Sequence, residues 1–92
     1  MNDYNYIAFM GKCNKSQEEL DIITEKCVDL AEKYNAQFNG LLRDITEETH
    51  IAYSGVFILK CDFKDYRDIY DKIKSELEKI TFIHSMNGGT IQ

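Results

Sequence analysis

Residues 16–35, SQEELDIITEKCVDLAEKYN, carry the pattern that decides the fold. Apolar side chains recur there every three or four residues, which places them on one face of an α-helix. Residues 65–80, DYRDIYDKIKSELEKI, repeat this pattern. Both segments therefore predict amphipathic helices packed on a core. The core-facing positions are Leu20, Ile23, Cys27, Leu30, Ala31 and Tyr34 in the first helix, and Tyr66, Ile69, Tyr70, Ile73, Leu77 and Ile80 in the second.

Strand-like runs rich in aromatic and aliphatic residues enclose both helices. They cover residues 4–10, 37–45, 50–63 and 81–86, and Ser54-Gly55 predicts a bulge in the longest of them. The order of elements is strand, helix, strand, strand, helix, strand. We therefore expect one α+β domain over residues 1–92, a split βαβ sandwich (βαββαβ) with an antiparallel sheet and two helices on one face.

Polar segments predict where these elements end. Residues 11–15 form a polar turn before the first helix, and residues 46–49 form the tip of a hairpin. Ser16 and Glu19 are spaced as a capping box, in which the hydroxyl accepts from the Glu19 amide while the carboxylate reaches back to the Ser16 amide. Asn87-Gly88-Gly89 predicts a turn, followed by a short tail.

This layout resembles the ferredoxin-like superfold, whose members include ACT-type regulatory domains, RNA-recognition motifs and several dimeric enzymes. The resemblance covers nearly the whole chain, but only as an order of elements. An RNA-recognition motif carries a basic and aromatic sequence on its third strand, where residues 53–59 offer only Phe57 in a matching place. Gly11 is similar to a glycine of ACT-type domains. A fold does not by itself imply a function.

Charge and composition narrow the range of partners. A net charge of −5 opposes direct binding of nucleic acid, because that binding depends on Lys and Arg. No apolar run is long enough to span a membrane, and no signal sequence is visible, so we expect a cytoplasmic protein. Cys13, Cys27 and Cys61 form no CxxC pair, which argues against disulfides and zinc. We predict no cofactor and no metal site.

Two surfaces favour a non-enzymatic interaction module, a regulator or inhibitor of another protein. The first helix carries six acidic residues, against Lys26 and Lys33 within it and Lys15 just before it, and such a face could occupy a basic groove as nucleic acid does. Strand alternation also leaves aromatic and apolar side chains on the sheet face away from the helices, which favours a homodimer. The predicted partner-binding residues are Glu18, Glu25, Asp29, Glu32, Tyr4 and Tyr6.

The turn before the first helix supports an alternative, a small-ligand sensor of the ACT type. Free amides at a helix N-terminus and two lysines suit an anion, although the second glycine of a Walker A loop is missing. Lysines and the helix start would also lower the pKa of the Cys13 thiol. The alternative without a ligand is a solvated turn with a good helix cap. The predicted ligand-binding residues are Gly11, Lys12, Cys13, Lys15 and Ser16.

A third alternative is an enzyme of the dimeric α+β barrel kind. It would use His84, Tyr6 or Cys13 in a pocket lined by the sheet. No catalytic set accompanies these residues in the sequence, so we assign no catalytic residue. His50 and His84 are isolated rather than spaced as metal ligands.

Overall fold

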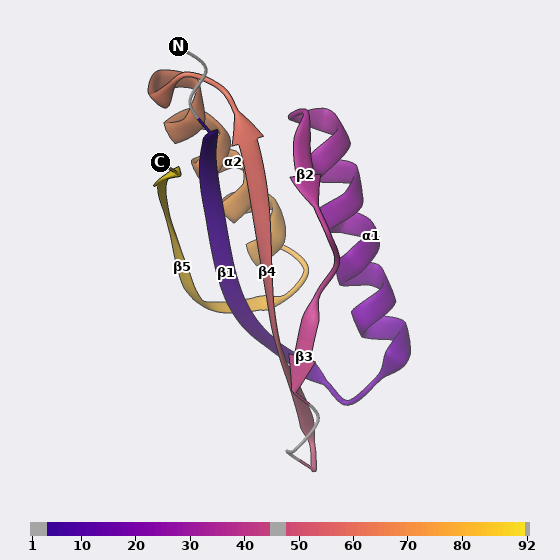
Figure 1. The fold of residues 1–92 in the computed structure, drawn as a ribbon. Coiled ribbons are helices and arrows are strands. Elements are labelled where there is room, and N and C mark those ends of the chain that lie inside the picture. The colour runs from indigo at the N-terminus through magenta and orange to yellow at the C-terminus, as the bar shows by residue number, and fades with distance from the viewer. Residues whose placement is uncertain (1–3, 45–47, 92) are drawn as a thin grey trace.

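The computed structural model describes residues 4–44 and 48–91 (Figure 1). Two helices cover one face of an antiparallel sheet, and the predicted α+β class and βαββαβ order are confirmed. The second predicted strand is divided into two short ones. The elements are β1 (Tyr4–Asn14), α1 (Gln17–Lys33), β2 (Ala36–Phe38), β3 (Leu42–Asp44), β4 (His50–Lys60), α2 (Phe63–Glu78) and β5 (Phe82–Ile91).

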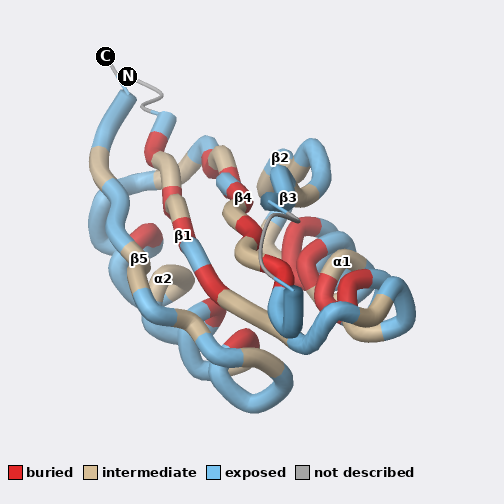
Figure 2. Tube along the Cα trace, turned by 90° about the horizontal axis from the view of Figure 1, so that it is seen from below, coloured by how far each residue is buried: buried red, intermediate tan, exposed pale blue. Residues whose placement is uncertain are grey.

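The long strands β1 and β4 form the centre of the sheet. The strand order is β2-β4-β1-β5, and β3 also pairs with β4 beyond the end of β2. All of these pairings are antiparallel. Buried residues alternate along β1 and β4 (Figure 2), because only one face of the sheet is covered by helices. We call the uncovered side the open face.

The core forms between the helix-covered side of the sheet and the predicted stripes of the helices. Phe57 lies at its centre, with its ring centroid 5.7 Å from that of Phe9 and 5.2 Å from that of Phe38. The predicted core positions of α1 are buried, except that Tyr34 is half-buried. In α2 the helix ends before Ile80, which is therefore exposed rather than in the core. Cys61 is half-buried against the core.

The polar turn predicted at residues 11–15 is wrong for most of its length. Gly11 to Asn14 continue β1 and pair with β4, and Gly11 and Lys12 also pair with β5. Gly11 is needed because the Tyr53 hydroxyl lies where a Cβ atom would be. The glycine thus serves close packing within a strand.

The turn predicted at residues 87–89 is also wrong, because these residues lie within β5. Gly88 pairs with Ile7, and β5 continues to Ile91 opposite Tyr4. A Cβ atom at Gly88 would collide with the Tyr66 hydroxyl, which donates a hydrogen bond of 2.9 Å to the Tyr6 carbonyl. The predicted tail therefore belongs to the sheet as far as Ile91.

The bulge predicted at Ser54-Gly55 is absent from the β1–β4 ladder, in which Phe9 pairs with Gly55 and Met10 with Ser54. The irregularity lies instead between β1 and β5, where His84 is the extra residue. The strand predicted at 37–45 breaks between β2 and β3, where Gly40 has a φ of 100°. Residues 45–47, including part of the predicted hairpin tip, lie outside the described residues.

Candidate functional site

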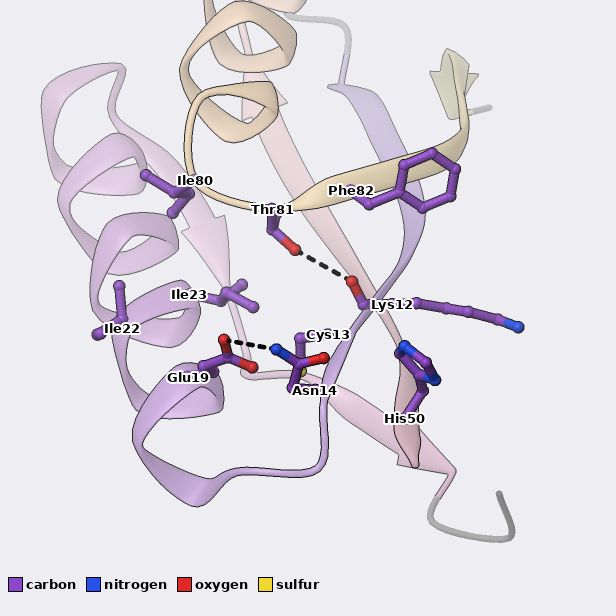
Figure 3. Close-up of a pocket in the computed structure, with 10 residues that line it drawn as sticks. All are labelled: Lys12, Cys13, Asn14, Glu19, Ile22, Ile23, His50, Ile80, Thr81 and Phe82. Carbon is purple, nitrogen blue, oxygen red and sulfur yellow. Dashed lines mark hydrogen bonds between the residues drawn. The ribbon is translucent and has the colours of Figure 1, made fainter. Parts of the chain in front are cut away.

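A pocket of about 490 Å³ opens where β1 ends, α1 begins and α2 passes into β5 (Figure 3). We call it the basal pocket. Its lining mixes polar and apolar side chains, so it suits a ligand of mixed character. Its lining residues are Lys12, Cys13, Asn14, Glu19, Ile22, Ile23, His50, Ile80, Thr81 and Phe82.

The carboxylate that lines the pocket belongs to Glu19, whose amide is held by the helix cap. Ser16 caps α1, and its hydroxyl accepts a hydrogen bond from the Glu19 amide at 3.3 Å. The reciprocal half of the predicted capping box is absent, because the Ser16 amide donates to the Asn14 carbonyl at 2.7 Å. The Glu19 carboxylate accepts instead from the Asn14 side-chain amide at 3.3 Å (Figure 3).

Cys13 lies beside Glu19, and its thiol is not activated. Burial raises the pKa of the Cys13 thiol, and the negative charge of Glu19 raises it further. The predicted lowering of this pKa is therefore wrong. The lysines were expected to lower it, but Cys13 is on the helix-covered side of β1, whereas the Lys12 side chain extends away from Glu19 (Figure 3). A thiol with a raised pKa is a poor nucleophile at neutral pH.

Tyr53 and Thr81 tie the wall of the pocket to the core. The two hydroxyl groups form a short hydrogen bond, and the Thr81 hydroxyl also donates to the Lys12 carbonyl at 3.4 Å. Burial raises the pKa of Tyr53 to about 12. These contacts hold the α2–β5 connection against β1, so this part of the pocket is preformed.

The structure divides the predicted ligand-binding residues. Lys12 and Cys13 line the basal pocket, whereas Gly11 is buried beneath Tyr53. Lys15 and Ser16 do not line it, and the Ser16 hydroxyl serves the helix cap. The binding role of these residues stays a prediction, but the loop of free amides on which it was based is a paired strand.

Sequence reasoning missed the residues that other elements bring to the pocket. The sequence marked Glu19 as a capping residue. Its carboxylate is nevertheless free to line the pocket, because the Ser16 amide donates to the Asn14 carbonyl and the carboxylate accepts from the Asn14 side chain. His50, Thr81 and Phe82 reach the pocket only through the pairing of β1 with β4 and β5. Nothing local in the sequence reports that pairing.

Most of the large hydrophobic side chains that are exposed in the described residues lie on the open face. Its residues come from β1, β4 and β5 and from the edge strands β2 and β3. Tyr6, predicted for partner binding, is half-buried on this face, opposite Gly89 of β5. Six of the ten large hydrophobic side chains that are exposed in the described residues lie on it: Tyr4, Met10, Leu42, Val56, Phe82 and Ile91.

The residues of the enzyme alternative do not converge. His84 lines a shallow pocket of about 260 Å³ on the open face beside Met10 and Leu42. Cys13 is on the opposite side of the sheet, and Tyr6 lies about 13 Å along β1 from Met10. The described residues also contain no group of three side chains suited to holding a metal ion.

The predicted acidic residues of α1 form a single row. Glu18, Glu25, Asp29 and Glu32 are all exposed, and their spacing of seven, four and three residues keeps them within an arc of about 60°. The row is about 21 Å long at the helical rise. No ion pair to any of the four is found in the described parts of the chain. We call these four residues the acidic row.

Neither described helix has the length and apolar character needed to cross a membrane.

Comparisons with known proteins identify the fold and no family. No family model and no curated protein matches the chain. Among solved structures it is similar to the C-terminal domain of the MgtC protein from Mycobacterium tuberculosis, with a TM-score of 0.63 and 6% identity over 98% of this chain and 88% of that one.

Two further structures extend this likeness. One is the ACT domain from GTP pyrophosphokinase of Chlorobium tepidum, with a TM-score of 0.54 and 9% identity over 97% of this chain and 100% of that one. The other is SnoaB, a cofactor-independent oxygenase from Streptomyces nogalater, with a TM-score of 0.55 and 10% identity over 100% and 93%. At these identities the likeness shows the ferredoxin-like fold alone, and the predicted fold class is confirmed.

Proposed function

We propose that this domain is a non-enzymatic protein-interaction module that forms a homodimer through its open face. The observation that carries this proposal is the gathering of six exposed hydrophobic side chains on one sheet surface. Contiguous apolar patches on small domains usually mark interfaces. Ile91, which the sequence assigned to a short tail, is instead part of β5 and adds to this surface.

The size of the open face suits a second copy of the chain. Strands of this length and number present a sheet surface of about 600–700 Å² at standard strand spacing and rise. A standard stable interface buries about 800 Å² on each partner. An apolar surface also matches itself without any requirement for opposite charge, so a two-fold pairing of identical faces is self-complementary.

The acidic row supports a second contact, with a different protein that has a basic surface. Its four carboxylates face away from the core and lie on the helix rather than on the sheet. A dimer formed through the open face would therefore leave the acidic row available. Charge of one sign in a line steers a partner of the opposite sign and fixes its register.

The acidic row has its own test. A triple variant, Glu18→Lys with Glu25→Lys and Glu32→Lys, changes exposed residues only, so we expect it to fold normally. Affinity capture with the wild type and with this variant, followed by mass spectrometry, identifies any partner held by the acidic row. A partner captured equally by both proteins would contradict this part of the proposal.

The sensor and enzyme alternatives have weaker support. An ACT domain is among the structural neighbours, but the anion loop on which the sensor prediction rested is a strand. An oxygenase is another neighbour, yet His84, Tyr6 and Cys13 do not share a pocket here. Burial also raises the pKa of the Cys13 thiol, which weakens it as a nucleophile.

Two valines allow a matched test of the dimer. Val56 is 45% exposed on the open face, and Val28 is 46% exposed on α1. We expect Val56→Lys to convert a dimer into a monomer, because it places a charge in the centre of the apolar surface. Val28→Lys should leave the dimer intact. Sedimentation equilibrium of both variants and the wild type measures the outcome.

Circular dichroism of the two variants controls for folding, since lysine has a low strand propensity that costs up to about 1 kcal/mol. A wild-type protein that stays monomeric at about 100 μM, a concentration at which even weak dimers with micromolar Kd form, would overturn the proposed dimer. Equal dissociation in both valine variants would do the same.

A further inference from the structure

The half-formed cap of α1 leaves a carboxylate without its usual partner. Since the Ser16 amide is taken by the Asn14 carbonyl, the Glu19 side chain cannot close the capping box. Its Oε1 atom accepts from Asn14 at 3.3 Å, which is long for a hydrogen bond of this kind. Its Oε2 atom is buried and has no hydrogen-bond partner among the described residues.

A buried carboxylate oxygen without a partner is unfavourable, and an N–H donor would satisfy it. The neighbouring side chains do not supply that donor. Asn14 is exposed, so its long contact with Glu19 can be exchanged for a ligand at little cost. The charge of Glu19 also acts on Cys13, where it helps to raise the pKa of the thiol. Beside Glu19 the local field therefore opposes anions and favours a cation, since the Lys12 side chain, which also lines the pocket, extends away from this position (Figure 3).

Apolar side chains also line the basal pocket. Ile22, Ile80 and Phe82 line it, and each is more than 40% exposed. They come from α1, from the segment after α2 and from β5, so three separate elements place exposed hydrophobic side chains around one pocket (Figure 3). Such surface gains free energy when an apolar group covers it.

We propose that the basal pocket binds an ammonium group attached to an apolar group. The ammonium displaces the Asn14 amide and donates to the Glu19 carboxylate, and Ile22 and Ile80 cover the apolar part. The ligand has the charge opposite to that of the anion expected from the sequence. The ammonium belongs either to a free amine or to a lysine side chain of a peptide. This inference goes beyond the proposed dimer and does not depend on it.

The probe for this site is phenethylamine, titrated into the full chain and followed by amide NMR spectra. Phenylacetate is the matched probe of opposite charge. We expect phenethylamine to shift the signals of Cys13, Glu19 and Thr81 and phenylacetate to leave them unchanged. An acetylated peptide with lysine next to phenylalanine distinguishes the sources: tighter binding of the peptide than of phenethylamine assigns the ammonium to a protein, and weaker binding assigns it to a free amine.

Two matched pairs of variants test the residues. Glu19→Gln keeps the Ser16 cap, which uses the backbone amide, and should weaken phenethylamine binding about tenfold or more, as expected for a hydrogen bond to a charged group. Glu18→Gln, one residue earlier and outside the pocket, should leave phenethylamine binding unchanged. Ile22→Ala should weaken binding severalfold, whereas Val28→Ala, on the same helix but outside this pocket, should not.

Three outcomes would overturn the inference. They are no binding of phenethylamine up to about 10 mM, a limit well above any specific affinity, equal binding of phenylacetate, and unchanged binding by Glu19→Gln. Should Glu19→Gln fail to fold, the comparison of Ile22→Ala with Val28→Ala and the phenylacetate control still test the proposed binding in the basal pocket.

Discussion

The two faces of the sheet are built from the same strands and have opposite properties. On β4, Phe57 is fully buried against the helices, while its neighbour Val56 is 45% exposed on the open face. On β5, a Cβ atom at Gly88 would collide with the Tyr66 hydroxyl, while a Cβ atom at Gly89 would make only an ordinary contact with the Tyr6 ring. Adjacent residues thus differ in what they can tolerate, and this comparison shows that packing constrains the helix-covered face much more tightly than the open face.

The largest effect should come from Phe57→Ala. This change removes a ring in contact with Phe9 and Phe38, and we expect it to cost about 3–5 kcal/mol of unfolding free energy. Val56→Ala, one residue earlier, should cost less than about 1 kcal/mol. Urea denaturation of both variants measures the difference, and Phe57→Leu replaces Phe57→Ala if the latter does not fold. Similar costs at the two positions would contradict the division between the faces.

The adjacent glycines of β5 give the next largest effect. Gly88→Ala forces a methyl group against the Tyr66 hydroxyl and the Tyr6 carbonyl, and we expect a loss of about 2 kcal/mol, typical of overpacking. At Gly89 the nearest atom would be 3.4 Å away, an ordinary contact, so Gly89→Ala should be neutral within about 0.5 kcal/mol. Thermal melts compare the two. If the double variant Gly88→Ala with Tyr66→Phe is no more stable than Gly88→Ala alone, the Tyr66 hydroxyl is not the cause of the lost stability.

Alkaline pH should produce the smallest effect, through Tyr53 on the helix-covered face. Burial raises the pKa of Tyr53 in the folded protein from 10.0 to about 12, so the unfolded chain loses this proton at a lower pH than the folded one. Stability is therefore complete below pH 10 and falls as the pH rises towards 12. Between pH 8 and 11 the loss from Tyr53 should be about 1 kcal/mol.

The Tyr53→Phe variant isolates this contribution. It lacks the titrating hydroxyl but keeps Cys27, whose pKa burial also raises to about 12, so the effect of the thiol cancels in the comparison. Denaturation of the two proteins at each pH measures the difference. A gap between wild type and variant that stays constant from pH 8 to 11 would show that Tyr53 titrates alike in the folded and unfolded chains.

The sequence was sufficient for the features that depend on local periodicity. The stripe of α1 and the alternation along β4 follow directly from the positions of apolar residues, and both are confirmed. Only half of the capping box predicted at Ser16 is confirmed, because the Ser16 amide donates to the Asn14 carbonyl rather than to the Glu19 carboxylate. Local pattern thus predicts the element and its buried face.

The glycines were misinterpreted because their reason lies elsewhere in the chain. Gly11 and Gly88 were assigned to turns, yet each makes room for a tyrosine hydroxyl, from Tyr53 of β4 and Tyr66 of α2. The same limit applies to the basal pocket, where Glu19 meets Ile80 and Phe82 only after the sheet has formed. Contacts between residues that lie far apart in the chain leave no signal in a single sequence.

The place of β1 in the sheet has a consequence for synthesis on the ribosome. β1 is made first, but it lies between β4 and β5, and Tyr4 pairs with Ile91. At about 5–20 residues per second, some 4–17 s pass between the synthesis of these two partners. Throughout that interval one edge of the central strand, with its apolar side chains, has no neighbour in the chain. A nascent-chain chaperone that holds residues of β1 would therefore have the most to protect before β5 emerges.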